Sequence, residues 1–160
     1  MTSDPLPRPL RELVERERLD VQLVSAGEAA HTAEAAARIL GVPVADIVKT
    51  LVLTDGTQAV AAVVPGDRRV DRARVAALAN TSKLRFASGE EVLAHTGYPP
   101  GGVAPLGFPR PLPMVVDASL AEPADRMVIA GGGRPELLIR VAVAAIVRAN
   151  GAALADITAS

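Results

Sequence analysis

Apolar and polar residues along this chain follow two spacings, one typical of helices and one typical of strands. Apolar positions three or four residues apart predict helices over residues 9–19, 32–40, 71–79, 88–94 and 142–149. Short runs rich in apolar and β-branched residues predict strands over residues 21–24, 47–54, 57–64, 83–86, 114–116, 127–130, 136–141 and 153–157. These elements intermix without a regular strand–helix–strand rhythm. We therefore expect an α/β fold of the α+β type, with helices around a mixed, curved sheet.

Turn and capping residues mark several element ends. Thr32 and Asp71 stand where helix N-caps are expected, and Gly41 follows the end of a predicted helix. The pair Asp55-Gly56 separates two β-rich runs, which is the signature of a hairpin. Residues 1–8 carry prolines and charges and are expected to form a loose tail. No internal repeat or long linker divides the sequence, so we expect a single domain over residues 1–160.

Composition narrows the function. Apolar residues make up 49% of the chain and charged residues 22%, as in soluble globular domains. Aromatic residues are only 2%, so the core must be built from Ala, Val, Leu and Ile. A scarcity of aromatic faces also argues against a stacking platform for single-stranded nucleic acid. The formal net charge is -1, which predicts no general DNA-binding surface and only local contacts with RNA.

Residues that hold metals or cofactors are scarce. The absence of cysteine excludes disulfides, thiolate metal sites and a cysteine nucleophile. His31 and His95 lie far apart, so neither a metal nor a cofactor is expected. No apolar run reaches about 18 residues, and the first residues lack the apolar stretch of a signal peptide. We therefore expect a cytoplasmic protein without a membrane partner.

Lys49 interrupts the apolar run IVKTLVL at residues 47–53. Side chains alternate between the two faces of a strand, and both faces of this one are mostly apolar, so Lys49 is expected to be partly buried. A buried ammonium group needs a partner or a bound anion. The chain has fifteen arginines but only two lysines, so lysine is seldom chosen here as a generic charge. The alternative is a gatekeeper lysine on an edge strand that points to water.

Three further segments are candidates for binding. The loop YPPGGVAPLG at residues 98–107 has adjacent glycines whose N–H groups could form an anion-binding nest or an oxyanion hole, with an ordinary surface loop as the alternative. The loop AGGGRP at residues 130–135 offers similar donors, but it lacks the patterns of nucleotide-binding loops. The segment GDRRVDRAR at residues 66–74 places Arg68, Arg69, Arg72 and Arg74 near a helix start, where they could hold tRNA phosphates or simply be solvated.

Taken in order, these segments resemble one family. The segments are TAEAAARILGVPVADIVKTLVL, VPGDRRVD, TGYPPGGVAPLG with PLPMVVD, AGGGRPELLIRV and GAALADI. They resemble the YbaK family of free-standing aminoacyl-tRNA deacylases, which is similar to the editing insertion domain of bacterial prolyl-tRNA synthetases. The resemblance covers residues 20–158, nearly the whole chain. It implies a barrel-like sheet surrounded by helices.

The resemblance also implies an activity and a set of site residues. The activity is trans-editing, in which the ester between a wrong amino acid and the 3′-terminal adenosine of tRNA is hydrolysed, most often on tRNA for proline. Prolyl-tRNA synthetase is then a candidate partner. The implied catalytic residues are Lys49, Gly101, Gly102, Val103 and Ala104. The implied substrate-binding residues are Thr50, Tyr98, Pro105, Gly131, Gly132, Gly133 and Arg134.

The chemistry fits these assignments. An aminoacyl ester is already reactive, so the protein needs mainly to hold the carbonyl group and stabilise the developing oxyanion. Backbone N–H groups of residues 102–104 could face that oxygen. We favour a positioning role for Lys49 over proton abstraction, because an ammonium group is a poor base near neutral pH. The pocket would exclude the cognate amino acid, proline, by shape.

One segment departs from the family pattern. Relatives that act on cysteinyl-tRNA tend to carry an acidic residue after the last glycine loop, and here Glu136 or Leu137 occupies that place. Gly133 stands where lysine is common. These differences argue against cysteine and leave alanine, serine, threonine and small non-protein amino acids open. The alternative functions are a non-catalytic module of the same fold that binds aminoacyl-tRNA or a synthetase, and an unrelated small hydrolase or ligand-binding domain.

Overall fold

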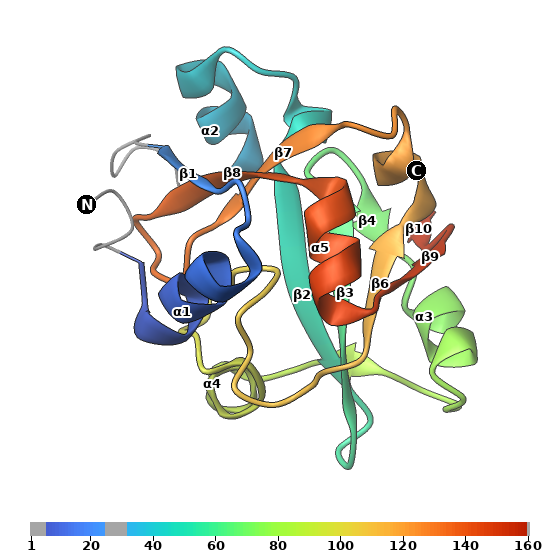
Figure 1. Cartoon of the computed structure of the whole chain (residues 1–160). Coiled ribbons are helices and arrows are strands. Elements are labelled where there is room, and N and C mark those ends of the chain that lie inside the picture. Colours follow the sequence, from blue (N-terminus) through green and yellow to red (C-terminus); the bar gives the residue numbers. More distant parts are fainter. Residues whose placement is uncertain (1–5, 25–31, 160) are drawn as a thin grey trace.

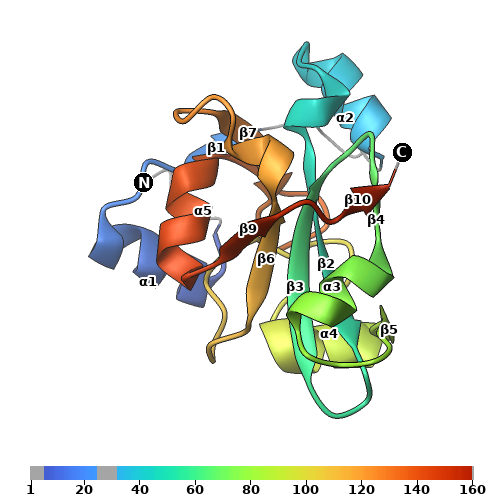
Figure 2. The same cartoon turned by 90° about the vertical axis from the view of Figure 1, so that its right-hand side faces the viewer.

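A computed structural model describes residues 6–24 and 32–159 (Figures 1 and 2). The helices are α1 (Arg8–Glu17), α2 (Ala33–Leu40), η1 (Val44–Asp46), α3 (Arg72–Leu78), α4 (Gly89–Thr96), η2 (Ala118–Ala121) and α5 (Val143–Asn150). The strands are β1 (Gln22–Val24), β2 (Val48–Thr54), β3 (Ala59–Pro65), β4 (Arg69–Val70), β5 (Arg85–Phe86), β6 (Met114–Asp117), β7 (Met127–Gly131), β8 (Leu138–Ala142), β9 (Ala153–Ala155) and β10 (Thr158–Ala159). Every helix and strand predicted from the sequence is therefore present.

The largest sheet has the strand order β5-β2-β3-β6-β9. Its centre is the predicted hairpin, in which β2 pairs antiparallel with β3 from Val48 opposite Pro65 to Thr54 opposite Ala59. β6 then runs parallel to β3, and β9 runs parallel to β6. The sheet is thus mixed, which confirms the fold class expected from the sequence.

Two smaller sheets complete the β-structure. β1, β8 and β7 form an antiparallel sheet in the order β1-β8-β7. A parallel bridge between Ile47 and Ile129 links this sheet to the start of β2. β10 pairs with β4 over two residues on each strand. The α-helices lie around these sheets (Figure 1), so the elements that frame the N-terminal end of β2 come from distant parts of the chain.

Two apolar clusters lie on opposite faces of the largest sheet. The main core takes Val48 and Val52 from one face of β2 and packs them with residues of β8 and α5. The second core takes Leu53 from the other face and packs it with Val75 of α3. Each of these side chains contributes roughly 1.5–3 kcal/mol when it is fully buried. As expected, aliphatic residues dominate both cores, and all seven residues of β3 are buried.

Local capping groups explain where several helices begin. The Thr32 side chain accepts a hydrogen bond from the Ala35 N–H, and Gly41 closes α2 in a left-handed conformation. Asp71 caps α3 by accepting from the N–H groups of Ala73 and Arg74. These contacts confirm the predicted caps.

The predicted loose tail is wrong for residues 6–8. Leu6 is buried in the main core at 3% exposure, and α1 begins at Arg8. Leu10 is fully buried, while Leu13 and Val14 pack against the same core, as the helical spacing predicted. The rest of the predicted tail lies outside the described residues.

Candidate active site

A pocket of about 400 Å³ lies where α2, β2 and the two glycine loops meet. α2 contributes the residues of its first turn, and β2 contributes its N-terminal half. The lining consists of Thr32, Ala33, Ala36, Ile47, Val48, Lys49, Thr50, Leu51, Gly101, Val103, Gly131, Pro135 and Leu138. The structure thus brings together three of the segments that the sequence singled out.

Beside this pocket, β2 has an outer edge that is only partly paired. β3 covers the other edge along its full length, whereas β5 pairs with Leu53 and Thr54 alone. Residues of an antiparallel strand point their peptide groups alternately toward and away from the partner. The Val52 carbonyl accepts from the Ala87 N–H on the outer side, so the peptide groups of Thr50 point outward too. Among the described strands, none pairs with residues 49–51 on this side, which leaves backbone donors and acceptors next to the pocket.

Lys49 is the only charged side chain among the described residues that line the pocket. It is half-buried, as predicted, and its Nζ donates to the backbone oxygen of Arg68 at 3.3 Å. Within residues 6–24 and 32–159, no carboxylate forms an ion pair with it. A cation held by one neutral carbonyl can still bind an anion or a polarised carbonyl oxygen. Its place in the lining favours the ligand-binding interpretation over the gatekeeper.

Thr50 follows Lys49 and contributes to the same lining. Its Oγ1 has no exposed surface and no hydrogen-bond partner among the described residues. A buried hydroxyl group without a partner costs about 1–3 kcal/mol. Such a group is therefore destabilising in the free protein.

The first glycine loop contributes two of its residues to the pocket. Gly101, whose φ of +85° favours glycine, and Val103 line it. The N–H of Gly102 instead donates to the Pro99 oxygen at 3.0 Å, so this donor is already used. Ala104 is fully buried outside the lining. The prediction that all three N–H groups of residues 102–104 face a ligand is thus corrected, and Val103 is the remaining candidate donor on the lining.

Pro105 packs inside the protein and does not line the pocket. It is buried outside the lining, and its carbonyl oxygen accepts from the Asn150 side chain at 2.8 Å. This contact ties the end of the first glycine loop to α5.

The second glycine loop packs directly on the first. A Cβ atom at Gly131 would lie 2.5 Å from the Val103 oxygen, and one at Gly102 would lie 2.6 Å from the Arg134 carbonyl carbon. Both positions therefore require glycine. Gly131 lines the pocket, whereas Gly132 and Gly133 are buried outside the lining. Close packing explains these glycines at least as well as ligand contact does.

Tyr98 is a core residue, which corrects its predicted contact with substrate. Its side chain is 2% exposed and does not belong to the described lining. Its hydroxyl group donates to the backbone oxygens of Leu106 at 2.7 Å and Gly107 at 3.2 Å. Burial raises the pKa of this hydroxyl well above its ordinary value. Tyr98 therefore fixes the course of the first glycine loop.

The predicted arginines are all exposed on the surface. Arg68 and Arg69 are exposed in and after the turn that follows β3, where the Arg68 carbonyl holds Lys49. Arg72 is exposed and stacks over the Phe86 ring at 5.6 Å, so part of its role is local packing. Arg134 is exposed in the second glycine loop. The structure leaves Arg68, Arg69 and Arg134 accessible for phosphate contacts.

Eight lining residues were not among the predicted site residues: Thr32, Ala33, Ala36, Ile47, Val48, Leu51, Pro135 and Leu138. Thr32 was recognised only as a helix cap, and the others are small or apolar residues without distinctive chemistry. Glu136, a candidate for the acidic position of cysteine-specific relatives, is exposed outside the lining, and Leu137 packs near Gly132. Neither residue places a carboxylate in the pocket.

No group of three or more His, Asp or Glu side chains lies close enough to hold a metal ion in the described part of the chain. His31 lies outside the described residues. None of the described helices combines the length and the apolar character needed to cross a bilayer.

Comparison with known proteins places the chain among editing domains. A family model described as an aminoacyl-tRNA editing domain matches residues 27–149. The chain is 39% identical over 109 residues to the proline--tRNA ligase of Solidesulfovibrio magneticus, a match that covers 68% of this chain but only 19% of that enzyme. It is 32% identical over 130 residues to an Enterococcus faecalis protein named as a candidate Cys-tRNA(Pro)/Cys-tRNA(Cys) deacylase, with 79% and 77% of the two chains covered.

A solved structure agrees with these sequence matches. It is described as a candidate trans-editing enzyme for prolyl-tRNA synthetase and superposes with a TM-score of 0.81 at 32% identity. The match covers 97% of this chain and 99% of that one.

Proposed function

Because this chain belongs to the aminoacyl-tRNA editing domain family, we propose that it is a trans-editing hydrolase that deacylates mischarged aminoacyl-tRNA. The expected substrate is tRNA for proline that carries a small wrong amino acid. The names of the relatives support this proposal, since they include a proline--tRNA ligase and a candidate deacylase of Cys-tRNA(Pro).

One observation carries the proposal: Lys49 lines the same pocket as Gly101 and Val103. Lys49, Val103 and the open edge of β2 thus lie around one cavity. This set can hold an ester carbonyl without a nucleophilic side chain, which suits a substrate that is already reactive.

The proposed reaction is ester hydrolysis. A water molecule attacks the carbonyl carbon of the aminoacyl ester, and negative charge develops on the carbonyl oxygen. The bond to the ribose oxygen then breaks, and that oxygen takes up a proton, which gives free amino acid and uncharged tRNA. We assign the stabilisation of the developing charge to the Lys49 ammonium and the Val103 N–H, and contact with the bound aminoacyl group to Thr50.

The lining also supports a substrate class. Apart from Lys49, the described lining side chains are uncharged, and most are apolar. We propose that the pocket takes a small uncharged side chain and excludes proline by shape. Differences of one methylene group are worth about 1–3 kcal/mol, which is why a second, shape-based selection step is useful.

The remaining contacts follow from this placement. We propose that Arg68, Arg69 and Arg134 bind phosphates near the 3′ end of the tRNA, and that prolyl-tRNA synthetase is a partner in the cytoplasm. We also propose that residues 1–160 work as one editing domain. In support, the main core draws residues from Leu6 to Ile146.

The test is a deacylation assay on tRNA for proline charged separately with alanine, serine, cysteine or proline. We expect at least one mischarged species to be cleaved and the proline species to be spared. If no species is cleaved but charged tRNA still binds, the alternative of a non-catalytic binding module is correct.

A further inference from the structure

The N-terminal segment packs against the second glycine loop. A Cβ atom at Gly133 would lie 2.5 Å from Cγ and 2.9 Å from Cδ of Pro7, so the proline ring rests on this glycine. Gly133 has a φ of +99°, which also favours glycine. Residues 6–17 precede the region 27–149 that the family model matches. A segment outside that region thus contacts the second glycine loop.

The loop under Pro7 is a short turn between β7 and β8. The Gly132 N–H donates to the Leu137 oxygen at 2.8 Å, and the Leu137 N–H donates to the Arg134 oxygen at 3.0 Å. The turn also meets the first glycine loop, where a Cβ atom at Gly102 would lie 2.8 Å from the Pro135 nitrogen and one at Gly133 would lie 3.0 Å from Cε1 of Tyr98. The turn therefore contacts both Pro7 and the first glycine loop.

Pro7 itself is well anchored. Its neighbour Leu6 is 3% exposed and Leu10 is fully buried in the main core. The Pro7 carbonyl accepts from the Arg11 N–H at 2.9 Å, which fixes it to the first turn of α1. The pyrrolidine ring locks the backbone φ, so the contact surface on Gly133 is rigid.

We propose that Pro7 is a positioning residue for the editing reaction, because its ring packs on Gly133 of the 131–135 turn, which also contacts the first glycine loop, and so fixes one wall of the pocket. Gly131 and Pro135 in this turn, and Gly101 and Val103 in the facing loop, all line the pocket. This inference rests on the proposed function. A close-packed pocket wall rejects substrates by shape only if it is rigid. Without the Pro7 ring, the 131–135 turn has more room to move.

The test compares Pro7→Ala with Pro9→Ala. Pro9 is the matched control, since it lies exposed in the first turn of α1, two positions after Pro7. Amide hydrogen exchange of residues 132–137 and the ratio of cleavage rates for mischarged and proline-charged tRNA are measured for both variants and the wild type. We expect faster exchange and an about fivefold or larger fall in that ratio for Pro7→Ala only, within the about 10²-fold that a 1 Å misplacement can cost.

Equal behaviour of the two variants in exchange and in the rate ratio would overturn the proposal. So would a Pro7→Ala protein that loses thermal stability and slows on every substrate alike, without faster exchange in the turn. If the wild type cleaves no charged tRNA, the proposed function fails instead, and the exchange rates still decide whether Pro7 holds the turn.

Discussion

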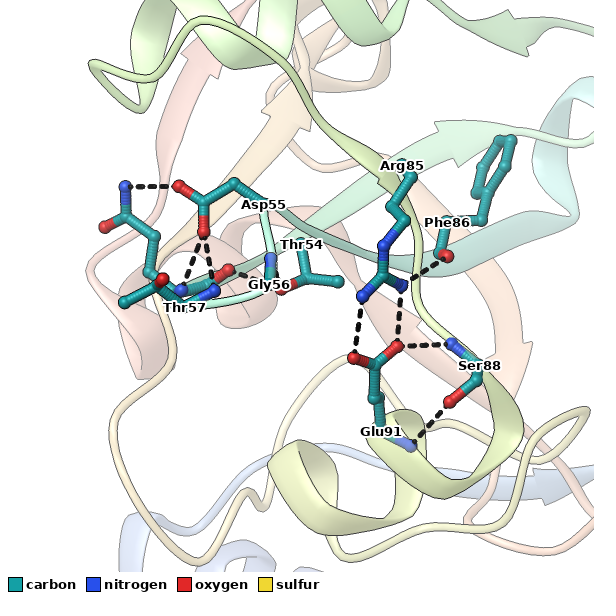
Figure 3. Close-up of polar contacts among 9 residues, drawn as sticks. Thr54, Asp55, Gly56, Thr57, Arg85, Phe86, Ser88 and Glu91 are labelled. Atoms are coloured by element: carbon teal, nitrogen blue, oxygen red, sulfur yellow. Dashed lines mark hydrogen bonds and ion pairs between the residues drawn. The ribbon is translucent and has the colours of Figure 1, made fainter.

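The polar groups at the two ends of β2 differ in how many hydrogen-bond partners they have. At the hairpin end, the Thr54 hydroxyl donates to the Gln58 oxygen at 2.7 Å, and Asp55 accepts from the N–H groups of Thr57 and Gln58 at 2.9 Å each (Figure 3). At the pocket end, the Lys49 ammonium has one contact at 3.3 Å with a carbonyl oxygen, and the Thr50 hydroxyl has no partner among the described residues.

The neighbouring segment extends the well-bonded end. Arg85 in β5 forms a two-pronged ion pair with Glu91, at 2.8 and 3.0 Å (Figure 3). Glu91 also accepts from the Ser88 N–H, and its own N–H donates to the Ser88 hydroxyl, which makes a capping box at the start of α4. Polar groups here are used to fix the chain.

The difference separates stability from function on a single strand. A polar group with its partners in place gives folding free energy, whereas one left without partners lowers it. Polar groups without partners beside a cavity are thus the ones that can form hydrogen bonds or ion pairs with a ligand. Positions that break the usual rules of folding are expected at functional sites. Changes at the pocket end should therefore alter activity, and changes at the hairpin end should alter stability.

The largest expected effect is that of Lys49→Ala. We expect deacylation to fall by about 10²-fold or more, as on loss of one group that stabilises a developing oxyanion. The melting temperature should stay close to that of the wild type, because the side chain makes only one long contact. Lys83→Ala is the matched control, since Lys83 is the other lysine of the chain and is exposed outside the lining. Equal losses of deacylation activity in the two variants would show that Lys49 is not an active-site residue.

Thr50→Val should have a smaller effect on activity. Its effects on stability and on activity are expected to differ in sign and can be measured separately. Valine keeps the shape but removes the unpartnered hydroxyl, so the free energy of unfolding should stay equal or rise by up to about 1–3 kcal/mol. If the hydroxyl contacts substrate, kcat/KM for the mischarged species should fall by about tenfold or less, as for one hydrogen bond. Urea unfolding and steady-state kinetics measure the two quantities. A less stable variant with unchanged kinetics would assign Thr50 to the core alone.

Ser88→Ala tests the opposite end. Loss of the helix cap should lower the free energy of unfolding by about 1 kcal/mol. In a domain of this size the melting temperature should fall by about 2–4 °C, while deacylation at lower temperature stays unchanged. Ser82→Ala, at an exposed position just before β5, is the control. A clear loss of activity in a folded Ser88→Ala protein would break the division between the two ends.

The smallest expected effect is a dependence of folding stability on pH in the acid range. Backbone N–H groups of Gln58 and Thr57 lower the pKa of Asp55 to about 2, and Arg85 with the Ser88 N–H lowers the pKa of Glu91 to about 2. A lowered pKa stabilises the folded state above the ordinary values of 3.8 and 4.5, and this contribution disappears as the pH falls through about 2. Thermal melts of wild type and of Asp55→Asn/Glu91→Gln should therefore differ above pH 4.5 and converge toward pH 2. A constant difference would rule out this origin.

Much of the fold could be predicted because its signals are local. The Asp55-Gly56 turn and the Thr32 and Asp71 caps each lie within a few residues of the contact they make. The pairing of β4 with β10 was missed because each strand has only two residues and its partner is distant in sequence. The parallel pairing of β6 with both β3 and β9 was not specified for the same reason, since a run of apolar residues does not name its neighbours.

The site divides in a similar way. Lys49 stood out because a charge in an apolar strand is costly, and it does line the pocket. Ala33 and Leu138 carry no such mark, and only the fold brings them there. Tyr98, Gly132 and Gly133 lie buried outside the lining. Glycine and tyrosine serve close packing as readily as ligand contact, and the sequence does not separate these uses.

The central claim, that Lys49 acts in catalysis, is tested most directly by measuring binding and cleavage on the same substrate. Wild type and Lys49→Ala are mixed in excess with whichever mischarged tRNA for proline the wild type cleaves, and the single-turnover rate and Kd are recorded. We predict a rate that falls by about 10²-fold with a Kd within a few-fold of the wild type, since a group that acts in the transition state is lost from the rate and not from ground-state binding. A variant that binds far more weakly yet cleaves at the wild-type rate once saturated would contradict the account and make Lys49 an anchor for the tRNA end.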